Sequence, residues 1–245
     1  KYKKDENFSE WFQELIKDND LVDDRYNIKG FIIYKPWCAR SLRKMYAIYH
    51  KALDDKNHEP LFMPILIPEE NFYKESEHVE GFTPEVFWVT SHGNNEPLEQ
   101  RLALRPTSET AFYQMYAHWI RSYKDLPFKR YQSGSVYRHE TKATRPFFRG
   151  REFFWIETHN AFRDEASARA QVNEDMLTTY EVLGDKFAVP FIFFKRPKWD
   201  TFAGAINTYA ADVLMPDGKV LQLPSTHYLG TNFAKAFGVK YKDEN

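Results

Sequence analysis

The chain has 245 residues, of which 42% are hydrophobic and 17% aromatic, and its formal net charge is −1. This length and apolar content are sufficient for one large domain with a core of its own. The near-neutral charge excludes a general attraction of the whole chain to nucleic acid, so any contact with RNA needs a local basic patch.

A single cysteine, Cys38, excludes an internal disulfide and a zinc site built from several cysteines. It fits a reduced, cytoplasmic setting. No run of 18 apolar residues predicts a membrane span, and the N-terminus lacks an apolar signal core, so we expect no membrane partner. Because no HxxxH or CxxC spacing occurs, no structural metal site is expected either.

Two helices and a short strand are predicted over the first 53 residues. Residues 8–17 have apolar side chains at helical spacing, and FIIY at 31–34 is typical of a short strand. Residues 41–53 predict a second helix, which Ser41 could cap. The apolar stripe of this helix consists of Leu42, Met45, Tyr46, Tyr49 and Leu53.

A proline interrupts the next apolar run, LFMPILIP at 61–68. Proline cannot donate to a sheet ladder, so this run is predicted to be an edge strand or an interface element. Residues 69–92 are predicted to form a loop and a strand, and residues 101–106 another strand. A helix follows that Thr107 or Ser108 could cap.

The rest of the chain is organised around the stretch 130–162. It predicts a strand that ends at 138–140, a polar loop, and a second strand at 152–158. Five basic residues and one acidic residue lie between positions 138 and 151. Side chains alternate along a strand, so one face of the second strand carries four chemically mixed groups: Phe153, Trp155, Glu157 and His159. Such a face under a basic loop indicates a polyphosphate above it and an amine nearby.

The C-terminal third adds a long helix and a hairpin. Residues 164–187 predict the helix and 191–194 a strand; a hairpin turns at 215–218, and a last helix covers 226–237. Strands dominate the middle of the chain and helices flank them, without repeated βα units. This order predicts one α+β domain, residues 1–245, with a mainly antiparallel sheet.

The central motifs resemble those of the class II aminoacyl-tRNA synthetases. Arg138-x-Glu140 and Arg149-x-x-x-Phe153 resemble the family's second motif. The helix at 41–53 and the proline-containing strand after it resemble the first motif, which implies a homodimer. The fold implied is a class II synthetase-like antiparallel sheet flanked by helices.

Two further segments narrow the resemblance to the prolyl-tRNA synthetases of the archaeal and eukaryotic type. They are RPTSET at 105–110 and THYLGTNF at 226–233. The resemblance implies that L-proline is activated with ATP to prolyl-adenylate and then transferred to tRNA(Pro).

Site residues are implied by the same resemblance. Arg138 is the implied catalytic residue, because its forked donors can bridge the amino acid carboxylate and the α-phosphate. The residues implied for the proline pocket are Thr107, Glu109, Arg138, Trp155, Glu157, His159, Phe202 and His227. Those implied for ATP are Arg138, Glu140, Arg149, Gly150, Phe153, Gln222 and Ser225. Without the resemblance, Thr107 would be interpreted only as a helix cap, and Arg138 and Arg149 only as charges of a solvated loop.

Adenylation suits these residue types. The attacking group is the ionised carboxylate of the amino acid itself, so catalysis needs only positioning and stabilisation of charge. No two glycines have GxG spacing, which excludes a glycine-rich phosphate cradle, so side chains and strands must hold ATP. Mg²⁺ is expected with the triphosphate.

Two parts of the family pattern are missing. The third motif, with its arginine, and the anticodon-binding domain are not found before Asn245, so an incomplete catalytic domain is expected. Gln222 is followed by Leu223 and Pro224, where the family commonly has two small residues. Two alternatives stay open. One is another class II synthetase, threonyl or seryl, and the other is a non-catalytic paralogue that acts as a binding module.

Overall fold

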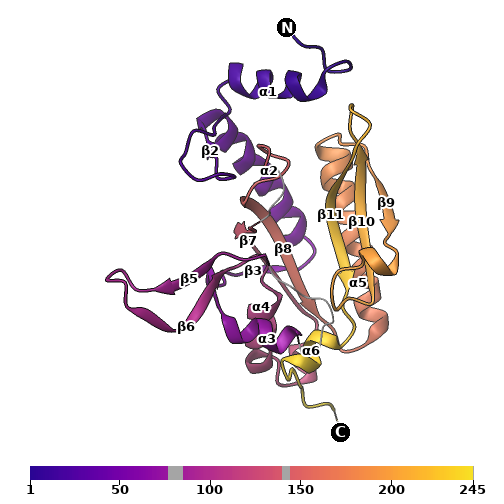
Figure 1. The fold of residues 1–245 in the computed structure, drawn as a ribbon. Helices are drawn as coiled ribbons and strands as arrows, with labels where there is room; N and C mark the ends of the chain where they lie inside the picture. The colour runs from indigo at the N-terminus through magenta and orange to yellow at the C-terminus, as the bar shows by residue number, and fades with distance from the viewer. Residues whose placement is uncertain (77–84, 140–143, 245) are drawn as a thin grey trace.

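The computed structural model describes residues 1–76, 85–139 and 144–244. Its centre is the strand pair β7 (Phe128–Tyr137) and β8 (Glu152–Ala161). The helices are α1 Phe8–Asp18, α2 Pro36–Asp54, α3 Glu69–Ser76, α4 Glu109–Trp119, α5 Glu165–Thr179 and α6 Asn232–Ala236. Figure 1 shows α1 and α2 at the N-terminal end of the molecule, and α3, α4 and α6 gathered at the C-terminal end.

The central pair is an antiparallel ladder in regular register. Phe128 pairs with Ala161 at one end and Tyr137 with Glu152 at the other. Beyond the ladder, the Arg138 N–H donates to the Arg151 carbonyl at 2.9 Å, which closes the base of the loop. The predicted strand–loop–strand unit is therefore confirmed.

The remaining strands form small sheets around this pair. They are β1 Val22–Asp23, β2 Ile33–Tyr34, β3 Glu59–Pro60, β4 Leu66–Pro68, β5 Trp88–Ser91, β6 Pro97–Leu104, β9 Ile192–Lys195, β10 Asn207–Leu214 and β11 Val220–Tyr228. β3 joins β7 as a parallel edge strand, whereas the other described pairings are antiparallel. The β10–β11 hairpin turns where expected, and Gly218 adopts φ +77°, a left-handed conformation that suits glycine. The predicted α+β class with mainly antiparallel pairing is confirmed.

Three predicted boundaries in the first half are wrong. α2 begins at Pro36 rather than at residue 41, because proline is favoured in the first helical turn, and Ser41 donates to the Trp37 carbonyl within the helix instead of capping it. Residues 61–68 do not form one strand, since only Leu66–Pro68 of this range is a strand, β4. A helix, α3, replaces the loop expected after residue 68.

The last predicted helix is also too long. Residues 226–228 continue β11, because Thr208 pairs with His227 and Asn207 with Tyr228 in the β10–β11 ladder. Only Asn232–Ala236 is helical. By contrast, the long helix predicted over 164–187 is confirmed, with α5 continuing as a π-helical segment, Tyr180–Lys186.

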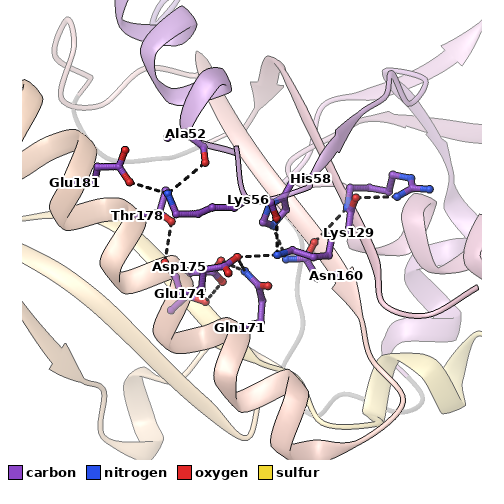
Figure 2. A network of polar contacts seen from close by, with 12 residues as sticks. Ala52, Lys56, His58, Lys129, Asn160, Gln171, Glu174, Asp175, Thr178 and Glu181 are labelled. Atoms are coloured by element: carbon purple, nitrogen blue, oxygen red, sulfur yellow. Dashed lines mark hydrogen bonds and ion pairs between the residues drawn. The ribbon is translucent and has the colours of Figure 1, made fainter. Parts of the chain in front are cut away.

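A polar network holds α5 against the central pair (Figure 2). Lys129 on β7 donates to Glu174 on α5 at 2.7 Å and to the Lys56 carbonyl at 2.8 Å. Burial, followed by the charge of Lys129, lowers the pKa of His58 to about 4, and the neutral ring accepts a hydrogen bond from the Asn160 amide at 3.1 Å. These contacts tie β7 to α5, and β8 to the residue that follows α2 and its turn, His58.

In the described part of the chain, no helix combines the length and the apolar character needed to span a bilayer.

Candidate active site

A cavity of about 2140 Å³ lies between β8 and β11. Its walls also include side chains of α2 and α5 and residues of the 144–150 segment. The expected site residues that the structure describes all line it: Thr107, Glu109, Arg138, Arg149, Gly150, Phe153, Trp155, Glu157, His159, Phe202, Gln222, Ser225 and His227. Glu140 lies outside the described residues. The fold thus brings together segments from four parts of the sequence, as expected.

The predicted alternation along β8 is observed. The Arg138 guanidinium lies over the rings of Phe153 and Trp155, 5.3 Å from each centroid, so these three side chains share a face. The Arg138 Nε donates to the Pro106 carbonyl at 3.0 Å, which anchors the guanidinium next to the TSE segment. On the opposite face, Phe154 is 46% exposed. The buried face of β8 is therefore the chemically mixed one.

Deeper along the same face, two carboxylates and an imidazole form a buried cluster. His159 Nε2 lies 3.0 Å from Glu157 Oε2. Burial alone would lower the pKa of His159, but Glu157 and the charge of Glu109 raise it. Burial alone would raise the pKa of Glu157, but the contact with His159 and hydrogen bonds from Ser108 and Gln132 hold it below its usual range. Both shifts favour the charged form, an imidazolium next to a carboxylate.

The third member, Glu109, is less well compensated. It begins α4, and the Thr107 hydroxyl donates to its Oε2 at 2.5 Å. Burial, with the nearby charge of Glu157, raises the pKa of Glu109 above its usual range. Thr107 therefore does not cap α4; it orients a carboxylate that lacks a full counter-charge.

His159 is held firmly in place. Its ring stacks on Phe112 with centroids 4.2 Å apart, and its backbone carbonyl accepts a hydrogen bond from the Tyr116 hydroxyl at 2.6 Å. Both aromatic residues are buried positions of α4. The same helix therefore carries Glu109 and supports the histidine that faces it.

On the β11 side of the cavity, His227 is a neutral ring. Burial, followed by the charge of His159, lowers its pKa to about 4. Its Nδ1 lies 2.9 Å from Thr208 Oγ1 and its Nε2 3.1 Å from Ser225 Oγ, and Phe202 packs on it with centroids 4.7 Å apart. Ser225, which the resemblance implies for ATP, thus contacts a residue implied for proline.

Two of the expected nucleotide residues, Gln222 and Gly150, have structural contacts of their own. Gln222 accepts a hydrogen bond at 3.2 Å from Arg196, which also makes a two-pronged contact with Asp212. A Cβ atom at Gly150 would lie 2.7 Å from the Glu152 carbonyl oxygen, so glycine is required there by close packing of the loop. Gly150 therefore has a structural reason to be present, apart from any contact with ATP.

A Mg²⁺ ion that is bound together with a nucleotide needs few ligands from the protein. The ion is usually held by one or two carboxylates together with substrate phosphates rather than by an all-protein cage. Among the residues that the structure describes, no group of three or more His, Cys, Asp or Glu side chains could hold a metal. Gln222 is the described candidate for an outer contact with an ion that arrives on the triphosphate.

Three buried residues of the cluster were not predicted as part of the site. Ser108, Gln132 and Arg105 are 0%, 2% and 6% exposed, and they connect to Glu157 directly or through one another. The only signal for Gln132 is its register, directly opposite Glu157 in the β7–β8 ladder.

Comparison with family models identifies the core of a known group. Residues 87–245 match the model described as tRNA synthetase class II core domain (G, H, P, S and T). This segment contains the cavity residues from Thr107 to His227.

Individual relatives agree with the family model. A proline–tRNA ligase of Thermofilum pendens is 56% identical over 242 residues, which are 99% of this chain and 50% of that protein. One of Pyrococcus abyssi is 45% identical over 98% of the chain and 50% of its own length. The chain therefore spans about half the length of the curated relatives it matches.

Solved structures give the same result at the level of the fold. A Giardia lamblia prolyl-tRNA synthetase in complex with prolyl-adenylate superposes with a TM-score of 0.94 at 37% identity, over 98% of this chain and 48% of that one. A Cryptosporidium parvum prolyl-tRNA synthetase complexed with halofuginone and AMPPNP superposes with a TM-score of 0.92 at 31% identity, over 100% of this chain and 48% of that one.

Proposed function

We propose that this chain, which belongs to the family of class II tRNA synthetase core domains, forms the amino acid-activating site of a proline–tRNA ligase. The reaction joins L-proline to ATP as prolyl-adenylate, and the prolyl group is then transferred to tRNA(Pro). A cytoplasmic setting is part of the proposal, and the single cysteine of the chain is compatible with it.

The charge balance of the buried cluster carries the proposal. Glu109 and Glu157 bring two carboxylates to the cavity, whereas His159 supplies one positive charge, so one carboxylate lacks a partner. A buried charge without a partner is costly. The secondary ammonium of proline would supply the missing positive charge, and Arg138 would pair with the carboxylate of proline. The site and a zwitterionic amino acid would then both be neutral.

The shape of the pocket supports a ring-shaped side chain. Trp155 and Phe202 line the cavity as flat apolar surfaces near the charged groups. Phe202 is fixed by His227 and by its stacking on Phe233, with centroids 6.4 Å apart. Aromatic walls of this kind favour a compact apolar ring over the hydroxyl-bearing side chains of serine or threonine, which would leave a polar group unpaired.

In the proposed reaction, no side chain acts as a nucleophile. The carboxylate of proline attacks the α-phosphorus, a new C–O–P linkage forms, and pyrophosphate leaves. Arg138 would hold the attacking carboxylate and the α-phosphate together. Arg149 and Phe153 would bind the nucleotide, while Mg²⁺, when bound, neutralises charge on the triphosphate.

Binding of proline is expected to raise the thermal stability of the chain. A ligand of the folded state at about 100 times its dissociation constant adds about 2.7 kcal/mol, equivalent to roughly 5–10 °C for a domain of this size. Differential scanning fluorimetry with L-proline and a non-hydrolysable prolyl-adenylate analogue checks this result. A folded sample that responds to serine or threonine analogues, but not to the prolyl compounds, would contradict the assignment.

We also propose that the protein works as a homodimer. Phe62 is 89% exposed, and Ile65 and Leu66 are exposed as well, so this segment presents three large apolar side chains to solvent. The apolar stripe of α2 is expected at or near the same interface, and its Met45 is 42% exposed.

Sedimentation velocity on a full-length protein containing this chain is expected to show a dimer at micromolar concentration. Phe62→Asp should weaken the dimer at least about tenfold, since the loss of a large aromatic anchor at the centre of an interface costs about 2 kcal/mol or more. Trp199→Asp is the matched control, because Trp199 is 86% exposed on another element. A strictly monomeric wild-type protein would refute this assembly.

A further inference from the structure

A fully buried amide lies beneath the charged cluster. Gln132 on β7 is directly opposite Glu157 on β8 and is 2% exposed. Its Nε2 donates to Glu157 Oε1 at 2.6 Å and to Ser108 Oγ at 2.7 Å. Its Oε1 accepts from the Met63 N–H at 3.0 Å and from Arg105 Nη1 at 3.2 Å. Both donors and both acceptor positions of the amide are therefore used.

Arg105 prevents this amide from turning over. Its Nη1 also donates to the Met63 carbonyl at 3.0 Å, and its Nε to the Ser135 carbonyl at 2.9 Å. A Cβ atom at Gly134 would lie 2.7 Å from Arg105 Nη2, so a glycine on β7 provides the room for the guanidinium. A reversed Gln132 amide would point its N–H groups at the donors of Arg105 and Met63. The orientation that donates to Glu157 is thus the one that the surroundings allow.

As a result, the two carboxylate oxygens of Glu157 have different, fixed hydrogen-bond partners. Oε1 is held by Gln132, while Oε2 accepts from the Ser108 N–H at 3.2 Å and lies 3.0 Å from His159 Nε2. Without Gln132, Oε1 would be a buried carboxylate oxygen without its donor, and the carboxylate could rotate away from His159.

We propose that Gln132 is a positioning residue of the amino acid site: it holds the Glu157 carboxylate in the rotation that directs Oε2 toward His159. This inference rests on the proposed function, because it concerns the pocket that receives the ammonium group. The four partners of Gln132 lie on β8, at Ser108, at Arg105 and in the 61–65 segment. Arg138 is expected to contact both substrates, and Glu140 lies outside the described residues. The other expected nucleotide residues lie on the 149–153 segment and on β11, away from these four partners, so the effect of Gln132 should fall mainly on the amino acid rather than on ATP.

The test measures KM for proline and KM for ATP separately. The assay is amino acid-dependent ATP–pyrophosphate exchange by the full-length protein. Gln132→Met keeps the size of the side chain but removes its donors and its acceptor. We expect KM for proline to rise about tenfold or more, and KM for ATP to change by less than about threefold, because only one substrate loses a binding partner.

A second variant adds a readout in pH. Gln132→Glu places a carboxylate against Glu157, and two adjacent carboxylates share a proton with one strongly raised pKa. Protonation would restore a donor to Glu157. KM for proline should therefore be lower at about pH 6 than at about pH 8 in this variant, relative to the wild type, and Gln132→Met should lack this dependence.

Tyr131→Phe is the matched control. Tyr131 is the neighbouring residue on β7, and its hydroxyl donates to Asp54 Oδ1 at 2.8 Å on the other face of the strand. Losing this buried hydrogen bond should lower the unfolding midpoint but leave both Michaelis constants unchanged.

Two outcomes would overturn the proposal. One is a folded Gln132→Met protein with an unchanged KM for proline, and the other is an equal rise of KM for proline and for ATP. If the wild type activates a different amino acid, the assignment to proline fails separately, and a selective rise in KM for that amino acid still supports the positioning role.

Discussion

Replacing Arg138 by lysine is expected to slow proline activation by about 100-fold or more, as the loss of a well-placed transition-state donor does in other enzymes. The Arg138 guanidinium can be anchored by one N–H group while its other N–H groups bind the substrates, and a lysine ammonium cannot do both in this planar geometry. Its Nε is anchored to the Pro106 carbonyl at 3.0 Å, and its plane lies over Phe153 and Trp155. A lysine keeps the charge but loses the planar fork that bridges a carboxylate and a phosphate.

Proline-dependent ATP–pyrophosphate exchange by the full-length protein measures this loss. Arg163→Lys is the control, because Arg163 also contacts two carboxylates, Asp243 and Glu244, but on the surface. We expect the control to retain activity within about threefold, since exposed ion pairs contribute little. A comparable result for Arg138→Lys would mean that Arg138 is only a charge at the base of the loop.

The central hairpin could be predicted from sequence because its signal is local. A strand without glycine or proline alternates its faces with period two, so the positions of Phe153, Trp155, Glu157 and His159 followed from the strand alone. The turn after β10 had an equally local signal in a proline and a glycine. In these places local propensity and tertiary structure agree.

The boundaries failed where one local signal competed with another. Ser41 resembles a helix cap, but Pro36, five residues earlier, is the better helix start. Glu69 and Glu70 follow Pro68 as an acidic first turn, which is a signal for α3 that the periodicity of the segment concealed. The spacing of Leu229, Phe233 and Phe237 predicts a helix that includes residues 226–228, but pairing with β10 keeps these three residues extended.

The support beneath the site could not be predicted, because it depends on contacts between distant segments. The Gln132 amide contacts Met63, Arg105 and Glu157, which are 69, 27 and 25 residues away from it in the sequence. A local pattern in the sequence, such as hydrophobic periodicity, does not indicate contacts between residues so far apart. The same holds for the raised pKa of Glu109, whose first cause is burial by residues remote in sequence.

Replacing Glu157 by glutamine is expected to destabilise the protein most in mildly acidic solution. The folded-state pKa of His159 is raised, so its contribution to stability is complete below the unfolded pKa of about 6.5 and is lost as the pH rises through the folded value. The pKa of Glu157 is lowered, so its contribution is complete above the unfolded pKa of about 4.3 and is lost as the pH falls through the folded value. Both contributions are therefore present together between these two limits.

At about pH 5.5 the glutamine variant must either bury an unpaired imidazolium or strip a proton from His159, and removing one partner of a buried pair costs about 3–5 kcal/mol. At about pH 8.5 the loss should be at most half as large, because the imidazole is then closer to neutral in both states. Urea unfolding at the two pH values measures the difference. Asp212→Asn is the control, because Asp212 forms a largely buried pair with Arg196, a residue type that stays charged throughout this range. If the Glu157→Gln loss is the same at both pH values, His159 and Glu157 do not form the charged pair on which the proposed recognition of the ammonium group depends.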